Sequence, residues 1–234
     1  MNACEQVWKP SQHQVYDIVC RGHKHLVTVC GSTEPSTMYA SFLLEQDLRE
    51  LWWDVEPDQV VLDAGSAYGS YTLSALAAGA KLVLAVDPDR DSFFDLESNL
   101  TLNWWRDRCG HFNFALSDVN EILPWYPASH SNRPEGDPEY RLNVTVDRFL
   151  ENQVDRLDWI KLDVEGMESR ILKGAAETLN KFHPRLLIEN HPAFVPGIED
   201  QIRAILKPLG YVESHISNDQ ANGSWSRWTW KDNA

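Results

Sequence analysis

Two acidic residues and two glycines stand where predicted strands end, in the order of a cofactor-binding turn. The first buried run ends in Asp63 and leads into Gly65 and Gly69 as D-x-G-x-x-x-G, and the next apolar run ends in Asp87. Glycine lets a turn approach a ligand closely, and an acid after the second strand can hydrogen-bond both hydroxyls of a ribose. A dinucleotide site would show G-x-G-x-x-G, and Asp63 would repel a pyrophosphate. The pattern favours S-adenosylmethionine, which carries a cationic amine.

A second group of polar residues follows two later strands and could take a proton from an acceptor. Asp163 and Glu165 come after the fourth apolar run, and His191 comes after the fifth. An imidazole titrates near neutral pH, so His191 is the expected general base, although it could instead only bond the loop backbone. Asp163 and Glu165 could orient the acceptor or the sulfonium, and Glu165 could instead stabilise a helix start. These three are the predicted catalytic residues.

The same strand ends raise the question of a metal ion. Asp163 together with Glu189-Asn190 resembles the acid and the acid-amide pair with which catechol-type O-methyltransferases hold magnesium. Oxygen ligands suit that ion. Two acids at neighbouring strand ends also occur in many metal-free sites, so Mg2+ is possible here but is not favoured.

Short apolar runs alternate with helical patterns from residue 60 onward, which is typical of a parallel sheet covered on both faces. The predicted strands are 60–64, 82–87, 112–116, 158–163 and 185–190. The predicted helices lie near 69–79, 90–103, 167–180 and 197–208. An antiparallel hairpin, 211–217 with 225–230, is expected to close the chain. The expected fold class is α/β, a doubly wound and mostly parallel Rossmann-like sheet.

The N-terminal part has a different pattern. Two β-rich runs within 15–30 predict a hairpin, and apolar residues at helical spacing predict a helix from about 38 to 53. We therefore expect an N-terminal appendage at 1–55 and a cofactor-binding domain at 56–234.

A proline-rich segment separates the third and fourth predicted strands of the sheet. Residues 124–141 contain four prolines, which argue against a helix or a central strand and predict a loop over the sheet. It forms most of an expected insertion at about 119–141. Trp125 and Tyr126 are its candidates for a lid over the acceptor, because flat aromatic faces can stack on sugar rings.

Six segments carry a resemblance to a known family. They are LDAGSAYGSYTL (62–73), AVDPD (85–89), FALSD (114–118), TVDRFL (145–150), DWIKLDVEGMESRILKGAAETL (158–179) and PRLLIENH (184–191). They resemble the FkbM-type family of class I S-adenosylmethionine-dependent methyltransferases, and I-K-L-D-V-E-G-x-E followed by L-x-G-A is the most specific part. The resemblance implies a seven-stranded sheet and O-methylation of hydroxyl groups, often on sugars or sugar-bearing natural products.

The resemblance also implies which residues hold the cofactor. In chain order the predicted cofactor-binding residues are Asp63, Gly65, Ser66, Tyr68, Gly69, Asp87, Leu116, Ser117 and Asp118. The chain departs from the family at Ala67-Tyr68, where the family commonly has an Asn followed by an aliphatic residue, and Tyr68 is a candidate to cover the methionine part. The glycine turn would line the methionine part, and Asp87 would hold the ribose. The last three would bracket the adenine, with Asp118 accepting a hydrogen bond from its amine.

Composition restricts the partners. The 234 residues include 21 Lys+Arg and 35 Asp+Glu, a net charge of −14, which works against binding nucleic acid or an anionic membrane. Neither a secretion signal nor a membrane-spanning run is visible, so a cytoplasmic location is expected. The four cysteines lie singly and indicate reduced thiols: Cys4, Cys20, Cys30 and Cys109.

The expected function is transfer of a methyl group to a hydroxyl of a glycan or small natural product, and a homodimer is possible. Two alternatives stay open. N-methyltransferases commonly carry an Asn/Asp-Pro-Pro-aromatic turn where this chain has Asp-Val-Glu-Gly. A non-catalytic scaffold that binds S-adenosylmethionine is the other alternative.

Overall fold

The structure is a computed structural model that describes the backbone of residues 14–20, 23–29, 49, 51–125, 138–219 and 223–233. It describes the side chains of residues 49, 51–125, 138–214 and 224–232. Within this part of the chain, no helix is long and apolar enough to cross a membrane.

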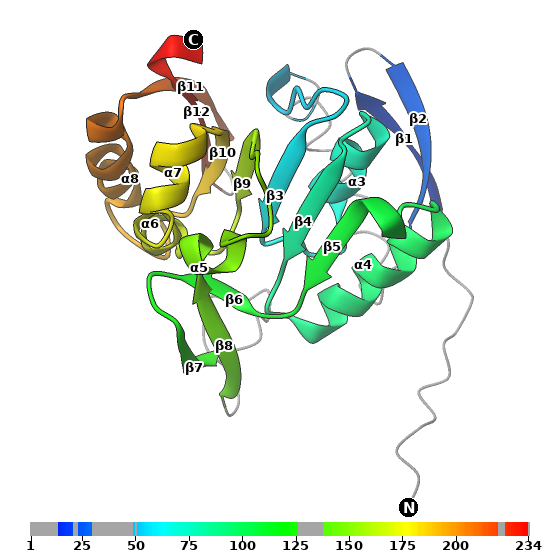
Figure 1. Ribbon diagram of the computed structural model, residues 1–234, viewed down its shortest axis with the longest axis horizontal. Helices are drawn as coiled ribbons and strands as arrows, with labels where there is room; N and C mark the ends of the chain where they lie inside the picture. Colours follow the sequence, from blue (N-terminus) through cyan, green and yellow to red (C-terminus); the bar gives the residue numbers. More distant parts are fainter. Residues whose placement is uncertain are drawn as a thin grey trace, which may run out of the picture.

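A seven-stranded sheet runs through the molecule in the order β11-β12-β10-β9-β3-β4-β5 (Figure 1). In that order the strands are Tyr211–Asp219, Gly223–Trp230, Arg185–Asn190, Trp159–Leu162, Val60–Ala64, Leu82–Val86 and Cys109–Phe112. The five strands from β10 to β5 are parallel, whereas β12 runs antiparallel to both β10 and β11. The predicted fold class and the closing hairpin are confirmed.

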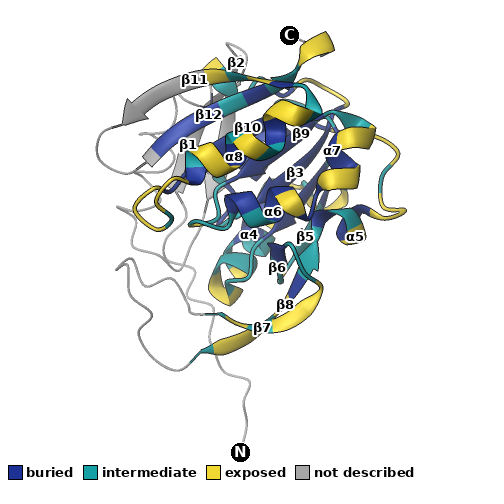
Figure 2. Cartoon of the chain, turned by 90° about the vertical axis from the view of Figure 1, so that its left-hand side faces the viewer, coloured by how far each residue is buried: buried dark blue, intermediate teal, exposed yellow. Residues whose placement is uncertain are grey.

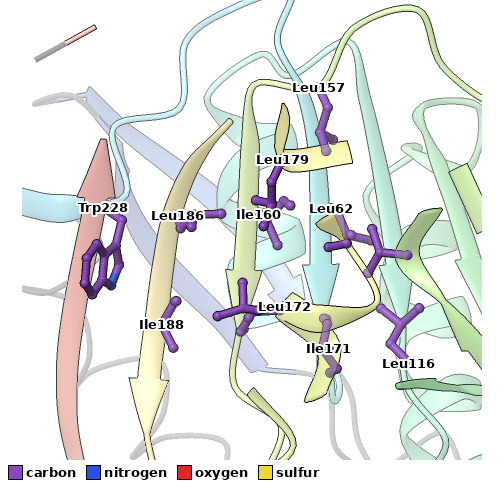
Figure 3. Packing of buried hydrophobic residues seen from close by; sticks show 14 of the residues in the cluster. Leu62, Leu116, Leu157, Ile160, Ile171, Leu172, Leu179, Leu186, Ile188 and Trp228 are labelled. Atoms are coloured by element: carbon purple, nitrogen blue, oxygen red, sulfur yellow. The ribbon is translucent and has the colours of Figure 1, made fainter. Parts of the chain in front are cut away.

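Helices cover both faces of this sheet, which explains why its central strands are mostly apolar. One face carries α3 (Ser70–Ala77) and α4 (Arg90–Leu102), and the other carries α5 (Val146–Leu150), α6 (Glu168–Lys173), α7 (Ala176–Phe182) and α8 (Ile198–Leu206). Successive strand residues alternate between the faces: Val61 packs in the cluster with α3, and Leu62 packs in the cluster of Figure 3. Short 3-10 turns occupy Arg106–Arg108, Lys207–Leu209 and Lys231–Asn233.

The helix predicted near 167–180 is two helices, α6 and α7, separated at Gly174. A Cβ on Gly174 would lie 2.2 Å from the carbonyl oxygen of Ser117. The chain breaks here because the backbone around Ser117 comes close to it, a contact that helical periodicity cannot reveal.

The predicted N-terminal hairpin is present as β1 (Gln14–Cys20) and β2 (His23–Val29), which pair antiparallel from Gln14 opposite Val29 to Cys20 opposite His23. It lies beside α3 and α4 (Figure 1). Most of the helix predicted at about 38–53 falls outside the described residues. The division of the chain at residue 55 stays a prediction.

A second, smaller sheet differs from expectation. Its order is β6 (Ala115–Ser117), β8 (Glu139–Thr145) and β7 (Glu121–Trp125), so the run predicted as one strand at 112–116 is divided between two sheets. The described ends of the predicted loop are likewise strands, because β7 pairs with β8 along its whole length. Proline is tolerated in β7 because this is an edge strand. Most of β7 and the first part of β8 are exposed (Figure 2). Residues 126–137, which include Tyr126, lie outside the described residues.

Candidate active site

The predicted site residues gather at one edge of the central sheet, where the parallel strands end. β3 lies between β4 and β9, so the chain moves outward from β3 in one direction through β4 and β5 and in the other through β9 and β10. Ligands of such sheets bind outside the carboxyl ends of the strands at this reversal point. The turn after β3 and the segments after β4, β9 and β10 all start there.

The turn after β3 depends on glycine at two positions. Gly65 has φ +74°, and a Cβ on it would lie 1.7 Å from the carbonyl oxygen of Asp163. Gly69 caps α3 with φ +102°, and a Cβ there would lie 2.6 Å from Cδ1 of Leu96. The glycines thus let the turn pack directly on the end of β9 and on α4. Ser66 is buried in the same turn.

Tyr68 belongs to the same turn, between the two glycines. It is buried in the hydrophobic cluster on the α3–α4 face, where its backbone carbonyl accepts a hydrogen bond from Asn99 Nδ2 at 2.8 Å. It packs there with apolar residues of α4. Its role in covering the methionine part stays a prediction.

Asp63 is fully buried beneath the turn. Its Oδ2 accepts a hydrogen bond from Thr72 Oγ1 at 2.6 Å, and its Oδ1 lies 3.5 Å from Lys161 Nζ. Burial raises the pKa of Asp63, while Lys161 and Thr72 oppose that rise. The carboxylate is thus balanced by a cation of the chain itself, and direct contact with a cofactor amine stays a prediction.

Asp87 is placed as an acid that binds a ribose would be. It follows β4, and its two carboxylate oxygens accept hydrogen bonds from the backbone N–H groups of Ala67 at 2.9 Å and Asp89 at 2.8 Å. Burial raises the pKa of Asp87 to about 6, although both backbone hydrogen bonds lower it. Each oxygen keeps lone pairs for a further donor, so the pair of ribose hydroxyls fits this carboxylate.

The three residues predicted to bracket the adenine follow one another at the end of β6. Leu116 and Ser117 are buried, and Asp118 accepts hydrogen bonds at Oδ1 from Ser117 Oγ at 3.1 Å and from Arg170 Nε at 2.8 Å. The hydrogen bond from Arg170 lowers the pKa of Asp118, so this carboxylate is ionised at neutral pH. Arg170 lies on α6 and was not among the predicted residues.

The three predicted catalytic residues come together at the ends of β9 and β10. His191 is buried, and its Nε2 lies 3.7 Å from Asp163 Oδ1 and 3.6 Å from Glu165 Oε2. Its Nδ1 lies 2.6 Å from Oε1 of Glu168. Burial alone would lower the pKa of His191, but the hydrogen bond to Glu168 and the surrounding carboxylates raise it overall. The raised pKa makes the ring a stronger base than a free imidazole.

Two buried charged residues contact the predicted site residues but were not among them: Glu168 and Lys161. Lys161 Nζ donates to the carbonyl of Gly65 at 2.8 Å and lies 3.3 Å from Asp163 Oδ2, so it joins the turn after β3 to the end of β9. A lysine inside an otherwise apolar strand was the available signal. Glu168 stood within the family-like segment, but its spacing alone did not show that it would meet His191.

Two observations concern the metal site that the sequence left possible but did not favour. Ligand atoms of Asp163, Glu189 and His191 lie within 4.8 Å of one another, a grouping that could hold a metal ion. Asn190, however, donates from Nδ2 to the carbonyl of Ser224 at 2.8 Å and to its hydroxyl at 3.1 Å. Its amide is thus hydrogen-bonded to β12, which does not support an acid-amide pair for magnesium.

Trp125, the described member of the predicted lid, is half-buried against a neighbouring strand. The guanidinium of Arg141 lies 5.0 Å from its ring centroid, and Arg141 Nε donates to the carbonyl of Pro88 at 2.8 Å. These contacts tie β8 to the segment that follows β4. They place Trp125 near the Asp87 end of the site, and its role as a lid stays a prediction.

The fold is that of solved methyltransferases. The methyltransferase FkbM from Methylobacillus flagellatus KT superposes with a TM-score of 0.56 at 17% identity, covering 82% of this chain and 48% of that one. The Thermus thermophilus 16S rRNA methyltransferase RsmC, solved with AdoMet and guanosine, superposes with a TM-score of 0.52 at 19% identity, covering 95% of this chain and 52% of that one. The Escherichia coli putative methyltransferase yhhF superposes with a TM-score of 0.54 at 12% identity, covering 93% of this chain and 98% of that one. The chain thus spans about half the length of the first two.

A family model gives the more specific assignment. The model of the methyltransferase FkbM domain matches residues 63–213, which is more than half of the chain. The chain belongs to this family. None of the curated proteins matches it.

Proposed function

We propose that this protein is a methyltransferase that transfers the methyl group of S-adenosylmethionine to a hydroxyl group of a glycan or a small natural product. The observation that carries the proposal is the closeness of the two halves of the site, since a Cβ on Gly65 would come within 1.7 Å of the backbone oxygen of Asp163. The turn proposed to hold the donor therefore adjoins the residues proposed to activate the acceptor. In-line transfer needs this closeness, because the acceptor oxygen must be held about 3–3.5 Å from the methyl carbon.

The donor half is chemically suited to the parts of S-adenosylmethionine, which supplies an electrophilic methyl group on its sulfonium. Asp87 presents a carboxylate already fixed by two backbone N–H groups, which suits the two ribose hydroxyls. Arg170 and Ser117 both use Oδ1 of Asp118, so Oδ2 is the oxygen proposed to accept from the adenine amine. Gly65 and Gly69 are proposed to bring backbone close to the methionine part, as the family resemblance implies.

The acceptor half supplies a base. A hydroxyl attacks poorly unless it loses its proton during the transfer, so a group of suitable pKa must lie within hydrogen-bond reach. We assign proton removal to Nε2 of His191, the ring nitrogen that faces Asp163 and Glu165. Those two carboxylates are proposed to orient the acceptor hydroxyl or to face the sulfonium charge.

Oxygen is favoured over nitrogen as the accepting atom for two reasons. The segment after β9 reads Asp163-Val164-Glu165-Gly166 and lacks the prolines and the aromatic residue common in N-methyltransferases. The net charge of −14 also disfavours a nucleic acid acceptor, since such partners require a positive surface. The likeness to RsmC is in fold alone. A hydroxyl on a glycan or small natural product remains the substrate class implied by the family.

Two measurements test the proposal. Calorimetry with S-adenosylmethionine should show binding, and a methyl-label assay across glycans and hydroxylated natural products should give a methyl ether. His191→Ala should bind the donor as the unchanged chain does while losing product formation. Donor binding with no product on any hydroxyl, amine or RNA substrate would favour the scaffold alternative, and product on an amine would overturn the assignment to oxygen.

A further inference from the structure

Glu168, the first residue of α6, is a fully buried carboxylate beside the proposed base. Its Oε1 lies 2.6 Å from Nδ1 of His191, and the side chains of the two residues are 0% and 7% exposed. A carboxylate leaves water at a high cost in free energy unless it is paired or hydrogen-bonded. The fold thus buries a carboxylate where it contacts Nδ1 of the His191 imidazole.

The turn before α6 is shaped to make this contact. Glu165 and Gly166 both have positive φ, +53° and +97°. The N–H of Gly166 then donates to Oε1 of Glu168 at 3.0 Å. A Cβ on Gly166 would lie 3.0 Å from a methyl carbon of Val195, so the turn packs closely on the segment that follows His191. Backbone strain of this kind is common at functional sites.

The charged groups around the imidazole are unequally distributed. Glu168 occupies the Nδ1 side, and Asp163 and Glu165 approach Nε2 at 3.7 and 3.6 Å, too far for hydrogen bonds. The other charged side chains nearby are Glu189, which contributes an oxygen within 4.8 Å of the Asp163–His191 group, and Lys161, 3.3 Å from Asp163. A proton on Nδ1 is therefore held by a direct hydrogen bond, whereas Nε2 faces the acceptor side.

We infer that Glu168 is the positioning residue of the proposed methyl transfer: by accepting the Nδ1–H of His191, it leaves Nε2 as the atom that takes the proton of the acceptor hydroxyl. The inference rests on the proposed function. In the balanced step the hydroxyl proton moves to Nε2, an oxygen electron pair forms the O–CH3 bond, and the S–CH3 pair stays on sulfur. The products are a methyl ether and S-adenosylhomocysteine, and the imidazolium then loses its proton to water.

A merely structural role explains Glu168 less well. Its second oxygen, Oε2, is buried and has no hydrogen-bond partner among the described residues. An unsatisfied buried oxygen destabilises a fold, and an apolar side chain of similar size would avoid that cost. A carboxylate is retained because its charge and its acceptor oxygen both act on His191.

The first test needs neither acceptor nor donor. Glu168→Gln keeps an oxygen that can accept from Gly166 and from Nδ1 but removes the charge. NMR titration of the His191 Cε1–H in the full chain, assigned with His191→Gln, should show its pKa falling by about one unit or more, as expected when a contacting opposite charge is lost. Glu177→Gln, on an exposed position of α7, is the matched control and should leave the titration unchanged. An unchanged His191 titration in Glu168→Gln would overturn the inference.

The second test uses methyl transfer. In Glu168→Gln the pH of half-maximal rate should move down with the His191 pKa, the rate plateau should fall about tenfold or more, and donor affinity should stay within about twofold. If Glu168→Gln fails to fold, Glu168→Asp replaces it, because this variant keeps the charge on a shorter side chain. It should retain the His191 titration, and a loss of that titration shift would count against the inference. If His191→Ala is inactive while Glu168→Gln keeps the full plateau, only the positioning role fails. If His191→Ala is fully active, the proposed base itself fails.

Discussion

Asp87 should make donor binding depend on pH. Its carboxylate accepts from the N–H groups of Ala67 and Asp89, and burial raises its pKa to about 6. If ribose hydroxyls donate to this carboxylate as proposed, donor affinity should be constant well above pH 6. It should fall at lower pH, as Asp87 takes up a proton. The free energy of unfolding should change in the opposite direction. Because the pKa of Asp87 is raised above its unfolded value, the folded chain binds the proton more tightly, so protonation of Asp87 stabilises the fold as the pH falls.

The magnitude follows from the pKa. At pH 5, one unit below about 6, roughly one molecule in eleven keeps Asp87 ionised, so the Kd for S-adenosylmethionine should rise about tenfold between pH 8 and pH 5. Asp87→Asn loses charge-assisted hydrogen bonds worth about 1.5–3 kcal/mol. Its Kd should therefore be about 10–150 times higher than that of the unchanged chain at pH 8, and it should no longer vary with pH.

Calorimetric titration with S-adenosylmethionine from pH 5 to pH 8 at constant ionic strength measures both effects, with circular dichroism as a check of folding. Asp91→Asn, a neighbouring exposed acid on α4, is the matched control and should keep the tenfold dependence. The reasoning is refuted if Asp87→Asn retains either the full affinity at pH 8 or the pH dependence of the unchanged chain.

Other parts of the site give separate expectations. Gly69→Ala should lower the free energy of unfolding by about 1–3 kcal/mol in urea titrations, because φ is +102° and the new Cβ would lie 2.6 Å from Leu96; no loss would contradict the geometry. Lys161→Met should lower the free energy of unfolding by about 3–5 kcal/mol, since it leaves the buried Asp63 without its cation. A decrease below about 1 kcal/mol would mean that Asp63 is neutral in the fold. Dialysis against EDTA should leave methyl transfer unchanged, because the amide of Asn190 is bound to β12. A loss of rate that Mg2+ restores would instead support a metal site.

The site could be predicted from sequence where strand ends carry the chemistry. The positions of Asp87 and His191 follow from the alternation of strands and helices, because parallel strands present their carboxyl ends at one edge. The sequence did not reveal the directions of side chains. Tyr68 lies in the core and the amide of Asn190 points to Ser224, and no local pattern records which neighbour a side chain will meet.

The sequence by itself determined the class of fold and the edge of the sheet where the site lies, since hydrophobic periodicity and strand-terminal residue types are local properties of the chain. Only the tertiary structure decided how charges are paired across elements distant in sequence. It placed Lys161 beneath the turn at Gly65 and Glu168 behind the imidazole of His191. These pairings depend on distances between separate strands and helices, which packing sets and the order of residues does not display.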